Sequence, residues 1–529
     1  MDFRLAALAL AGAAALTVSG HVGAQAGPFA GSTIAWTQKH VAANSSAPGF
    51  LSEIASFDSL TRTIWVAGVT GVDVLNASTG VSLGFIDTRA FGSINSVAIH
   101  GGIAAVALEA TDRKLPGQVL LFDTTTRSLA AGINQIAVGS LPDMLTFTPD
   151  GSRLLVANEG TPNWASGGVN DYGQVQTIAA NGTRSLGYAS AAEQAAKDPV
   201  GSVSIIDMAS RTVVATPNFT SVSPTGSNLR ANTGMDLEPE YIAVNAAGTK
   251  AFVTLQEANA MGVIDLTTNT ATKLIGLGAK DHGVDGNEID PLDTGSVVDF
   301  KKYANVRGLY MPDGAATFQI GGKTYVVMAN EGDFREDDLD RVAGTTFGGA
   351  GDLARLRVSS TDSSNGGNLF AAGARSFSIR DEDGNLVFDS GSTLDREAAA
   401  RGIYDDARSR DKGVEPEGVE LMHIDGKLYA FIGLERTLRG AVAVFDITDP
   451  VNATFVTMLL TNGTETRPEG LTGFTMDGYH YLAVTSEGSG FATSGTTVFA
   501  LAPVPEPGTY ALLLAGLGVM GAVVRRRRA

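Results

Sequence analysis

Short apolar runs separated by polar turns repeat along most of the chain. Each clear repeat begins with proline and an acidic residue, continues through an apolar run, a tight glycine turn and a second apolar run, and ends on glutamate. This order predicts an antiparallel pair of strands in every repeat. The acids that open and close the five clear repeats are Asp143 and Glu159, Glu240 and Glu257, Asp313 and Glu331, Glu417 and Glu435, and Glu469 and Glu487.

Two looser copies, residues 53–74 and 95–122, raise the number of repeats to about seven. Repeated strands joined by short polar turns are typical of a β-propeller. We therefore predict an all-β fold, a seven-bladed β-propeller with long inter-strand insertions, in which a strand near Ile34–Trp36 is a candidate to complete the last blade. Several copies also continue into a third apolar strand that ends on aspartate, at Asp123, Asp207, Asp265 and Asp446.

Three long segments interrupt the repeat, at residues 163–200, 270–311 and 341–414. Connections of this length in a compact fold are usually functional or pack as additional hairpins. Within the third segment, two apolar runs around an Asp-Gly turn predict one hairpin over Ser376–Asp389.

A sustained helical period of apolar residues is almost absent from the sequence. The nearest candidates for helices are Ser190–Lys197 and Thr393–Arg401. Helices are therefore expected to be few and short.

The acids of the repeat are expected to converge at one end of the propeller. An acid just before one strand and an acid just after its antiparallel neighbour lie at the same end of the hairpin. Equivalent positions of all blades surround the central channel, so the carboxylates should crowd one mouth, where like charges need compensation. The predicted metal-ligand set is Asp143, Glu159, Glu240, Glu257, Asp313, Glu331, Asp333, Glu417, Glu435, Glu469 and Glu487.

Two interpretations of this ring remain open. Oxygen ligands without any cysteine favour Ca²⁺ or Mg²⁺ over copper, and Ca²⁺ is the cofactor we expect. Alternatively, each carboxylate accepts backbone N–H bonds and locks its blade, while Arg436 and Arg467 supply local positive charge. The scattered histidines, among them His282, His423 and His480, are expected to be ordinary turn or strand residues rather than zinc ligands.

The composition narrows the possible functions. The chain has 529 residues, a formal net charge of −18 and no cysteine. Disulfides, thiolate metal sites and a cysteine nucleophile are thereby excluded. The negative charge disfavours binding to nucleic acid. The sequence contains no P-loop or dinucleotide-binding fingerprint, and Gly80–Gly84 matches a nucleophile elbow by letter only.

The N-terminal region has the features of a secretory signal. Arg4 precedes the uncharged apolar run Leu5–Val18, and the small residues Ala24 and Ala26 suit a signal peptidase. We expect cleavage after Ala26, so that residues 1–26 are removed on export. Residues 27–503 would then form the propeller domain.

The C-terminal region, residues 504–529, has three consecutive parts. The motif Pro505-Glu506-Pro507 is followed by the apolar run Tyr510–Val524 and by Arg525–Arg528. As a helix the apolar run would be about 22 Å long, short of a hydrocarbon core of about 30 Å. The arginines are expected to stay on the cytoplasmic side.

This arrangement resembles the PEP-CTERM sorting signal of Gram-negative bacteria. The resemblance implies that an exosortase cuts at Pro505-Glu506-Pro507. Until that cut, the inner membrane would hold the chain with its body facing the periplasm. Afterwards the body would reach the cell surface or the extracellular space.

The body of the chain, over residues 34–501, resembles the choice-of-anchor I family. Members of that family carry interchangeable surface anchors, and PEP-CTERM is one of them. Some are labelled alkaline phosphatase or esterase-like phytase, and the Pro-Glu-Gly phrases are similar to those of phytase-like propellers, whose acids hold Ca²⁺ that binds phosphate. The phrases that carry the resemblance are Met311–Gly314, Ala329–Asp333, Gly373–Ile379, Leu386–Gly391, Asp411–Gly418, Phe431–Arg436 and Phe445–Pro450.

Two functions are consistent with these features. The first is an exported, surface-anchored binding module of the cell envelope or matrix, with exopolysaccharide or a phosphoester as its ligand. The second is a Ca²⁺-dependent phosphoesterase, in which bound cations neutralise the phosphate and activate water. No unambiguous nucleophile or general base is visible, and we therefore favour the binding module.

Overall fold

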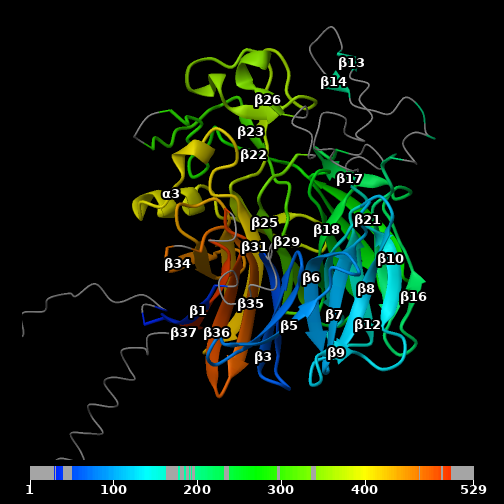
Figure 1. Ribbon diagram of the computed structural model, residues 1–529. Helices are drawn as coiled ribbons and strands as arrows, with labels where there is room; N and C mark the ends of the chain where they lie inside the picture. The colour runs from blue at the N-terminus through cyan, green and yellow to red at the C-terminus, as the bar shows by residue number, and fades with distance from the viewer. Residues whose placement is uncertain are drawn as a thin grey trace, which may run out of the picture.

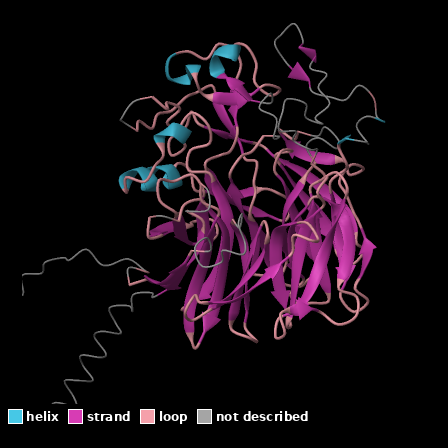
Figure 2. Cartoon of the chain, in the orientation of Figure 1, coloured by secondary structure: helices cyan, strands magenta, loops and turns pink. Residues whose placement is uncertain are grey.

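β-Strands make up most of the structure, a computed structural model (Figure 2). It describes residues 29, 31–39, 51–161, 197–230, 237–294, 298–334, 341–463, 465–489 and 493–501, with a few isolated positions between 177 and 192. The expected signal segment, the sorting tail and most of the candidate helix Ser190–Lys197 lie outside the described residues. Within the described ranges, no helix is long and apolar enough to cross a membrane.

Counted over the described residues, seven sheets each contain a four-stranded antiparallel path. The first three are β2 (Ser52–Asp58), β3 (Thr63–Gly68), β4 (Gly71–Asn76) and β5 (Ser82–Asp87); β6 (Ser93–His100), β7 (Ile103–Glu109), β8 (Pro116–Asp123) and β10 (Gln135–Ser140), with β9 (Ser128–Leu129) beside β8; and β11 (Pro142–Phe147), β12 (Arg153–Asn158), β15 (Ser202–Asp207) and β16 (Thr212–Ala215).

The next two sheets follow the same order of strands. They are β18 (Pro239–Val244), β19 (Lys250–Leu255), β20 (Ala260–Asp265) and β21 (Thr270–Leu277), with β17 (Pro224–Ser227) parallel to β21; and β24 (Ala315–Ile320), β25 (Lys323–Asn330), β29 (Ser376–Asp381) and β30 (Leu386–Asp389).

The last two sheets bring the chain back to its beginning. They are β31 (Pro416–Ile424), β32 (Lys427–Leu434), β33 (Ala441–Asp446) and β34 (Thr454–Leu460); and β35 (Pro468–Met476), β36 (Tyr479–Ser486), β37 (Gly495–Leu501) and β1 (Thr33–Gln38).

The first strands of these sheets form a closed ring. β2, β6, β11, β18, β24, β31 and β35 each contact the next in this order, and β35 contacts β2 again. A ring of antiparallel sheets that closes in this way is a β-propeller. The predicted all-β propeller is therefore confirmed (Figure 1).

The ring is closed by the two ends of the propeller domain. β1 runs antiparallel to β37, with Thr33 opposite Ala500 and Gln38 opposite Thr496. The indole Nε1 of Trp36 donates a hydrogen bond of 2.9 Å to the carbonyl oxygen of Ala77 in the first sheet. The candidate strand at Ile34–Trp36 thus completes the last sheet and also contacts the first.

The core lies between neighbouring sheets. In β3, Ile64 and Val66 pack towards Ala483 of the last sheet, whereas Trp65 packs towards Val106 of the second. Successive side chains of a strand point to opposite faces, so both faces of β3 are buried. This explains why the middle strands are uninterrupted apolar runs in the sequence.

The two faces of the ring carry different connections. On one face, called here the turn face, short turns join first to second and third to fourth strands, as between β2 and β3. On the opposite face, called here the mouth face, lie the links from second to third strand and from sheet to sheet. The long insertions after β12, β21, β25 and β30 all leave from the mouth face.

The insertions build a layer above the mouth face (Figure 1). Part of this layer has its own apolar cluster, which includes Ile289, Phe347 and Leu356. Its elements are β13 (Thr177–Ile178), β14 (Arg184–Ser185), β22 (Ala279–Asp281), β23 (Val306–Leu309), β26 (Arg341–Ala343), η2 (Gly344–Phe347), η3 (Gly351–Ala354), β27 (Arg357–Ser359), β28 (Leu369–Ala371), α3 (Thr393–Ala400) and η4 (Asp406–Arg408).

Two predicted boundaries of the insertions are wrong. Residues 270–277 form β21, the fourth strand of a propeller sheet, so the second insertion begins later than expected. The predicted hairpin over 376–389 exists, but as the β29 and β30 pair of another propeller sheet rather than as an addition. The helix predicted at Thr393–Arg401 is confirmed as α3, Thr393–Ala400.

Candidate functional site

Carboxylates from around the ring line one cavity of about 470 Å³ on the mouth face. They come from the starts of first strands and from the residues that follow second strands. The structure brings together all of the predicted residues, namely Asp143, Glu159, Glu240, Glu257, Asp313, Glu331, Asp333, Glu417, Glu435, Glu469 and Glu487. We call this set, with Glu53 and Glu238, the acidic mouth.

The backbone at the start of each first strand directs the acid into the cavity. The residue before the proline has a positive φ at Leu141, Glu415 and Arg467, where φ is 47°, 50° and 57°. A register shift follows directly, as between Pro142 and Leu145 in β11. Bulges of this kind re-aim side chains next to functional sites. The repeated Pro-acid pair is thus the sequence signature of this kink.

The sequence analysis did not predict some of the lining residues to be ligands. Glu53 in β2 and Asn95 in β6 hold the position that Asp143 holds in β11. Neither follows a proline, so the repeat pattern was weak at both. Asn95 places a neutral amide in the ring, and its Nδ2 donates a hydrogen bond of 3.2 Å to the carbonyl oxygen of Pro142.

One half of the mouth holds a group of three close carboxylates. Oxygen atoms of Asp143, Glu159 and Glu240 lie within 4.8 Å of one another. Burial, followed by repulsion from Glu109, raises the pKa of Asp143 to about 7. Burial, followed by repulsion from Glu159, raises the pKa of Glu240 well above its usual value. These shifts indicate negative charge that the protein compensates only in part.

A second group consists of Asp313, Glu331 and Glu417, again with oxygen atoms within 4.8 Å. The buried Oε2 of Glu417 has no hydrogen-bond partner among the described residues. Burial, followed by nearby carboxylates, raises the pKa of Asp313 and of Glu417 well above the usual values. This side of the mouth therefore also presents a carboxylate oxygen, Glu417 Oε2, that is free to bind a ligand.

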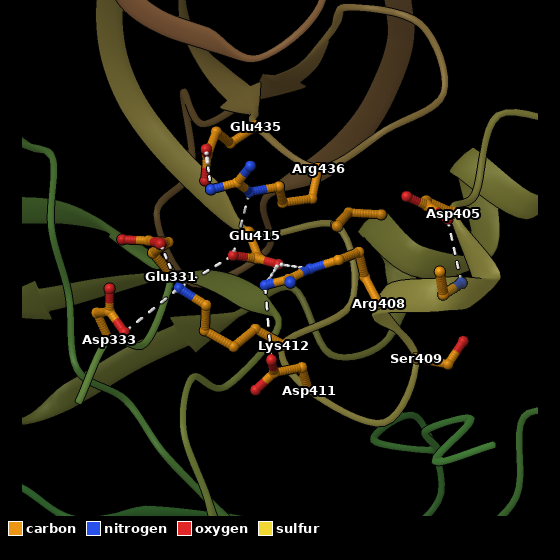
Figure 3. A network of polar contacts seen from close by, with 12 residues as sticks. Glu331, Asp333, Asp405, Arg408, Ser409, Asp411, Lys412, Glu415, Glu435 and Arg436 are labelled. Carbon is orange, nitrogen blue, oxygen red and sulfur yellow. Dashed lines mark hydrogen bonds and ion pairs between the residues drawn. The ribbon is translucent and has the colours of Figure 1, made fainter. Parts of the chain in front are cut away.

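Lys412, which lies in an insertion, is a buried cation beside this second group (Figure 3). Its Nζ lies 2.6 Å from Glu331 Oε1, 3.0 Å from Glu415 Oε2 and 3.8 Å from Asp333 Oδ1. Burial alone would raise the pKa of Glu331, but the Lys412 ammonium together with Gln256 and Arg436 outweighs burial and lowers that pKa. The third close group of acids, Glu331, Glu415 and Glu435, therefore surrounds a protein cation.

Arginines supply the remaining positive charge, as the sequence analysis expected. Arg436 Nη2 lies 2.7 Å from Glu435 Oε1, and Arg467 Nη1 lies 3.5 Å from Glu487 Oε2. Arg408 adds a further contact of 2.6 Å to Glu415, which is fully buried (Figure 3). The mouth is thus unequal, because Lys412 and the arginines neutralise the Glu331 side more than the Asp143 side.

His282 and the carboxylate of Asp381 outside the mouth have structural roles. His282 is buried, its Nδ1 lies 2.7 Å from the carbonyl oxygen of Asn287, and burial lowers its pKa to about 3. Among the described residues, the close groups of possible metal ligands contain no histidine. At the β29–β30 turn, Asp381 Oδ1 accepts backbone N–H bonds from Asp383 and Asn385, as a tight turn requires.

The raised pKa values predict how stability depends on pH when no divalent cation is present. The pKa values of Glu53, Asp143 and Glu435 are raised to about 8, about 7 and about 8, mainly by burial. Unfolded carboxyls titrate near about 4. The folded state therefore binds more protons in this window, and its stability should fall as pH rises from about 4 to about 8.

Urea unfolding in the presence of a chelator, compared at pH 5 and pH 8, measures this slope. Glu240→Gln removes one of the raised groups and should make the slope shallower. Glu331, whose pKa is lowered, stabilises the folded state above the pH at which unfolded carboxyls titrate. Its contribution therefore does not change between pH 5 and pH 8. A stability that rises between pH 5 and pH 8 would contradict the prediction.

Comparisons with known proteins match two parts of the chain. The model of the choice-of-anchor I domain matches residues 53–450, and that of the PEP-CTERM protein-sorting motif matches residues 503–528. Among solved structures, hydrazine synthase of Kuenenia stuttgartiensis is similar with a TM-score of 0.45 and 12% identity, over 87% of this chain and 98% of that chain. The comparison with curated proteins gives no match. None of these findings points to phosphoester hydrolysis.

Proposed function

Because the chain belongs to the choice-of-anchor I family and carries a PEP-CTERM sorting motif, we propose that it is a binding module of the cell envelope whose acidic mouth binds divalent cations. The family and the motif indicate an exported, surface-anchored protein that an exosortase processes. Ca²⁺ is the ion we favour. The proposal includes signal-peptide removal after Ala26 and a temporary hold at the inner membrane.

The observation that carries the proposal is the group Asp143, Glu159 and Glu240, whose oxygen atoms lie within 4.8 Å of one another. Carboxylates this close repel unless a cation or protons lie between them. Arg113 lowers the pKa of Asp143 and Glu159, but burial and neighbouring carboxylates outweigh it. A cation would therefore relieve more repulsion here than beside Lys412.

The ligand chemistry favours Ca²⁺. Ca²⁺ accepts about six to eight oxygen ligands in flexible geometry, whereas Mg²⁺ demands a near-ideal octahedron. A cavity of about 470 Å³ leaves room for waters or for a ligand's own oxygens beside the carboxylates. A bound Ca²⁺ could then bridge the protein to an anionic polysaccharide or a phosphoester at the cell surface.

Calcium binding can be measured by titration calorimetry and by thermal unfolding of the full chain. The unfolding free energy should rise with Ca²⁺, by about 2.7 kcal/mol when the ion is at about 100 times its dissociation constant. The double variant Glu159→Gln/Glu240→Gln should lose this shift. Asp477→Asn is the matched control, because it removes a 64% exposed carboxylate on the turn face and should keep it.

Two outcomes would contradict the proposal. Wild-type unfolding that does not change with millimolar Ca²⁺ would show that the mouth does not bind the ion. An unchanged Ca²⁺ shift in the double variant would place the ion elsewhere. Phosphoester turnover measured in the same samples, with Ca²⁺ and with chelator, separates a binding module from a hydrolase.

A further inference from the structure

The last propeller strand ends on the face opposite the acidic mouth. β36 runs towards the mouth, where Glu487 follows its last residue and lines the cavity. β37 is antiparallel to it, with Gly495 opposite Ser486 and Leu501 opposite His480. Leu501 therefore lies at the turn face. At about 3.3 Å per residue, the strand places it about 23 Å from the mouth.

The segment between Leu501 and the sorting signal's apolar run is short. Eight residues lie between Leu501 and Tyr510, where the apolar run begins. Even fully extended, the nine steps from Leu501 to Tyr510 reach at most about 32 Å. To place the mouth against a membrane, this segment would have to span the sheet height of about 23 Å and then pass the insertions above the mouth face.

The two faces also differ in how far their connections protrude, and this observation is independent of the length of the segment. The insertions after β21, β25 and β30 stand on the mouth face. The turn face consists of short connections closed by their own side chains. In one of them Asp123 Oδ1 accepts backbone N–H bonds from Thr125 and Thr126. A face of low relief can lie close to a membrane surface, whereas the insertions on the other face need room.

We infer that the sorting signal holds the chain with its turn face towards the membrane and its mouth face outwards. The other end of the propeller domain fits this orientation, because Thr33 lies opposite Ala500 and so begins at the turn face too. Cations and larger ligands then reach the acidic mouth from the exterior without passing between protein and membrane. The inference rests on the sorting motif and the fold, and holds whether or not the mouth binds Ca²⁺.

The absence of cysteine from the sequence makes a labelling experiment clean. Val451→Cys places one thiol on the turn face between β33 and β34, at a position that is 61% exposed. Thr346→Cys places one on the mouth face, at an exposed position in η2. Each full-length variant is incorporated into phospholipid vesicles and treated with a maleimide carrying a bulky polyethylene glycol. Only chains whose propeller domain lies outside the vesicle can react. The two variants are therefore compared by their rates of labelling.

We expect the Thr346→Cys thiol to react as fast in vesicles as it does after proteolytic release of the protein. The Val451→Cys thiol should not be labelled in vesicles and should be labelled again after release. Inserting a flexible Gly/Ser linker of about 20 residues after Leu501 should restore labelling of Val451→Cys, because it removes the length limit. Equal rates for both thiols in vesicles, or loss at Thr346→Cys instead, would overturn the inferred orientation.

Discussion

Replacing Lys412 with methionine is expected to lower the free energy of unfolding by about 3–5 kcal/mol, because it leaves buried carboxylates without their cation. The Lys412 side chain is 4% exposed, and those of Glu331 and Glu415 are 9% and 0% exposed. Burial alone would lower the pKa of Lys412, but the carboxylates of Asp333 and Glu331 raise it well above its usual value. Urea unfolding at pH 7 measures the loss.

The matched control is Lys302→Met, which removes a 48% exposed lysine paired with Asp285 at 2.7 Å. An exposed pair contributes at most about 1 kcal/mol, so this variant should stay near wild type. The loss of unfolding free energy in Lys412→Met should also be smaller at low pH, since protonation neutralises the carboxyls that are left without a cation. A defect of equal size at pH 4 and pH 7 would mean that packing rather than charge is lost.

Replacing Arg375 with methionine is expected to detach the insertion layer from the propeller. Arg375 donates hydrogen bonds to the backbone carbonyls of Asp290, Ser409 and Asp411, at 3.1, 2.5 and 3.1 Å. It also lies 3.6 Å from Asp395 in α3, and the two side chains are 2% and 1% exposed. Removing one partner of a buried ion pair typically costs about 3–5 kcal/mol.

Limited proteolysis distinguishes this detachment from general unfolding. The Arg375→Met variant should be cleaved faster within residues 279–313, 341–374 and 390–414, while the propeller strands, including β29 and β30, stay protected. Arg355→Met is the control, since Arg355 is 50% exposed and its partner Asp293, at 2.7 Å, keeps a second partner in Arg410 at 3.0 Å. Uniform faster cleavage along the whole chain would contradict a role confined to docking the insertions.

The repeat made much of the fold and of the site predictable. The Pro-acid pair marks both the kink at the start of a first strand and the carboxylate that it directs into the mouth, as at Asp143 and Glu240. Hairpin geometry then places Glu159 and Glu257 at the same end. Local pattern and global position agree because every sheet meets the channel in the same way.

The position of Lys412 could not be predicted from the repeat. It lies 81 positions from Glu331 in the sequence, within an insertion that has no repeat to give its position. A lysine in a polar segment is usually solvated, and only the fold shows that this one is buried among carboxylates. Lys412 makes a ring that is uniform in the sequence unequal, because one half receives more positive charge than the other.

The pairing of β1 with β37 also sets the order in which the exported chain can finish folding. Thr37 and Thr497, whose side chains hydrogen-bond across this pair, are 460 positions apart. Contacts so distant form late, since nearly the whole chain must be present first. β1 emerges early during export, but its partner β37 emerges late, just ahead of the sorting motif at 503–528. A membrane hold at that motif would therefore give the ring time to close before the protein is released.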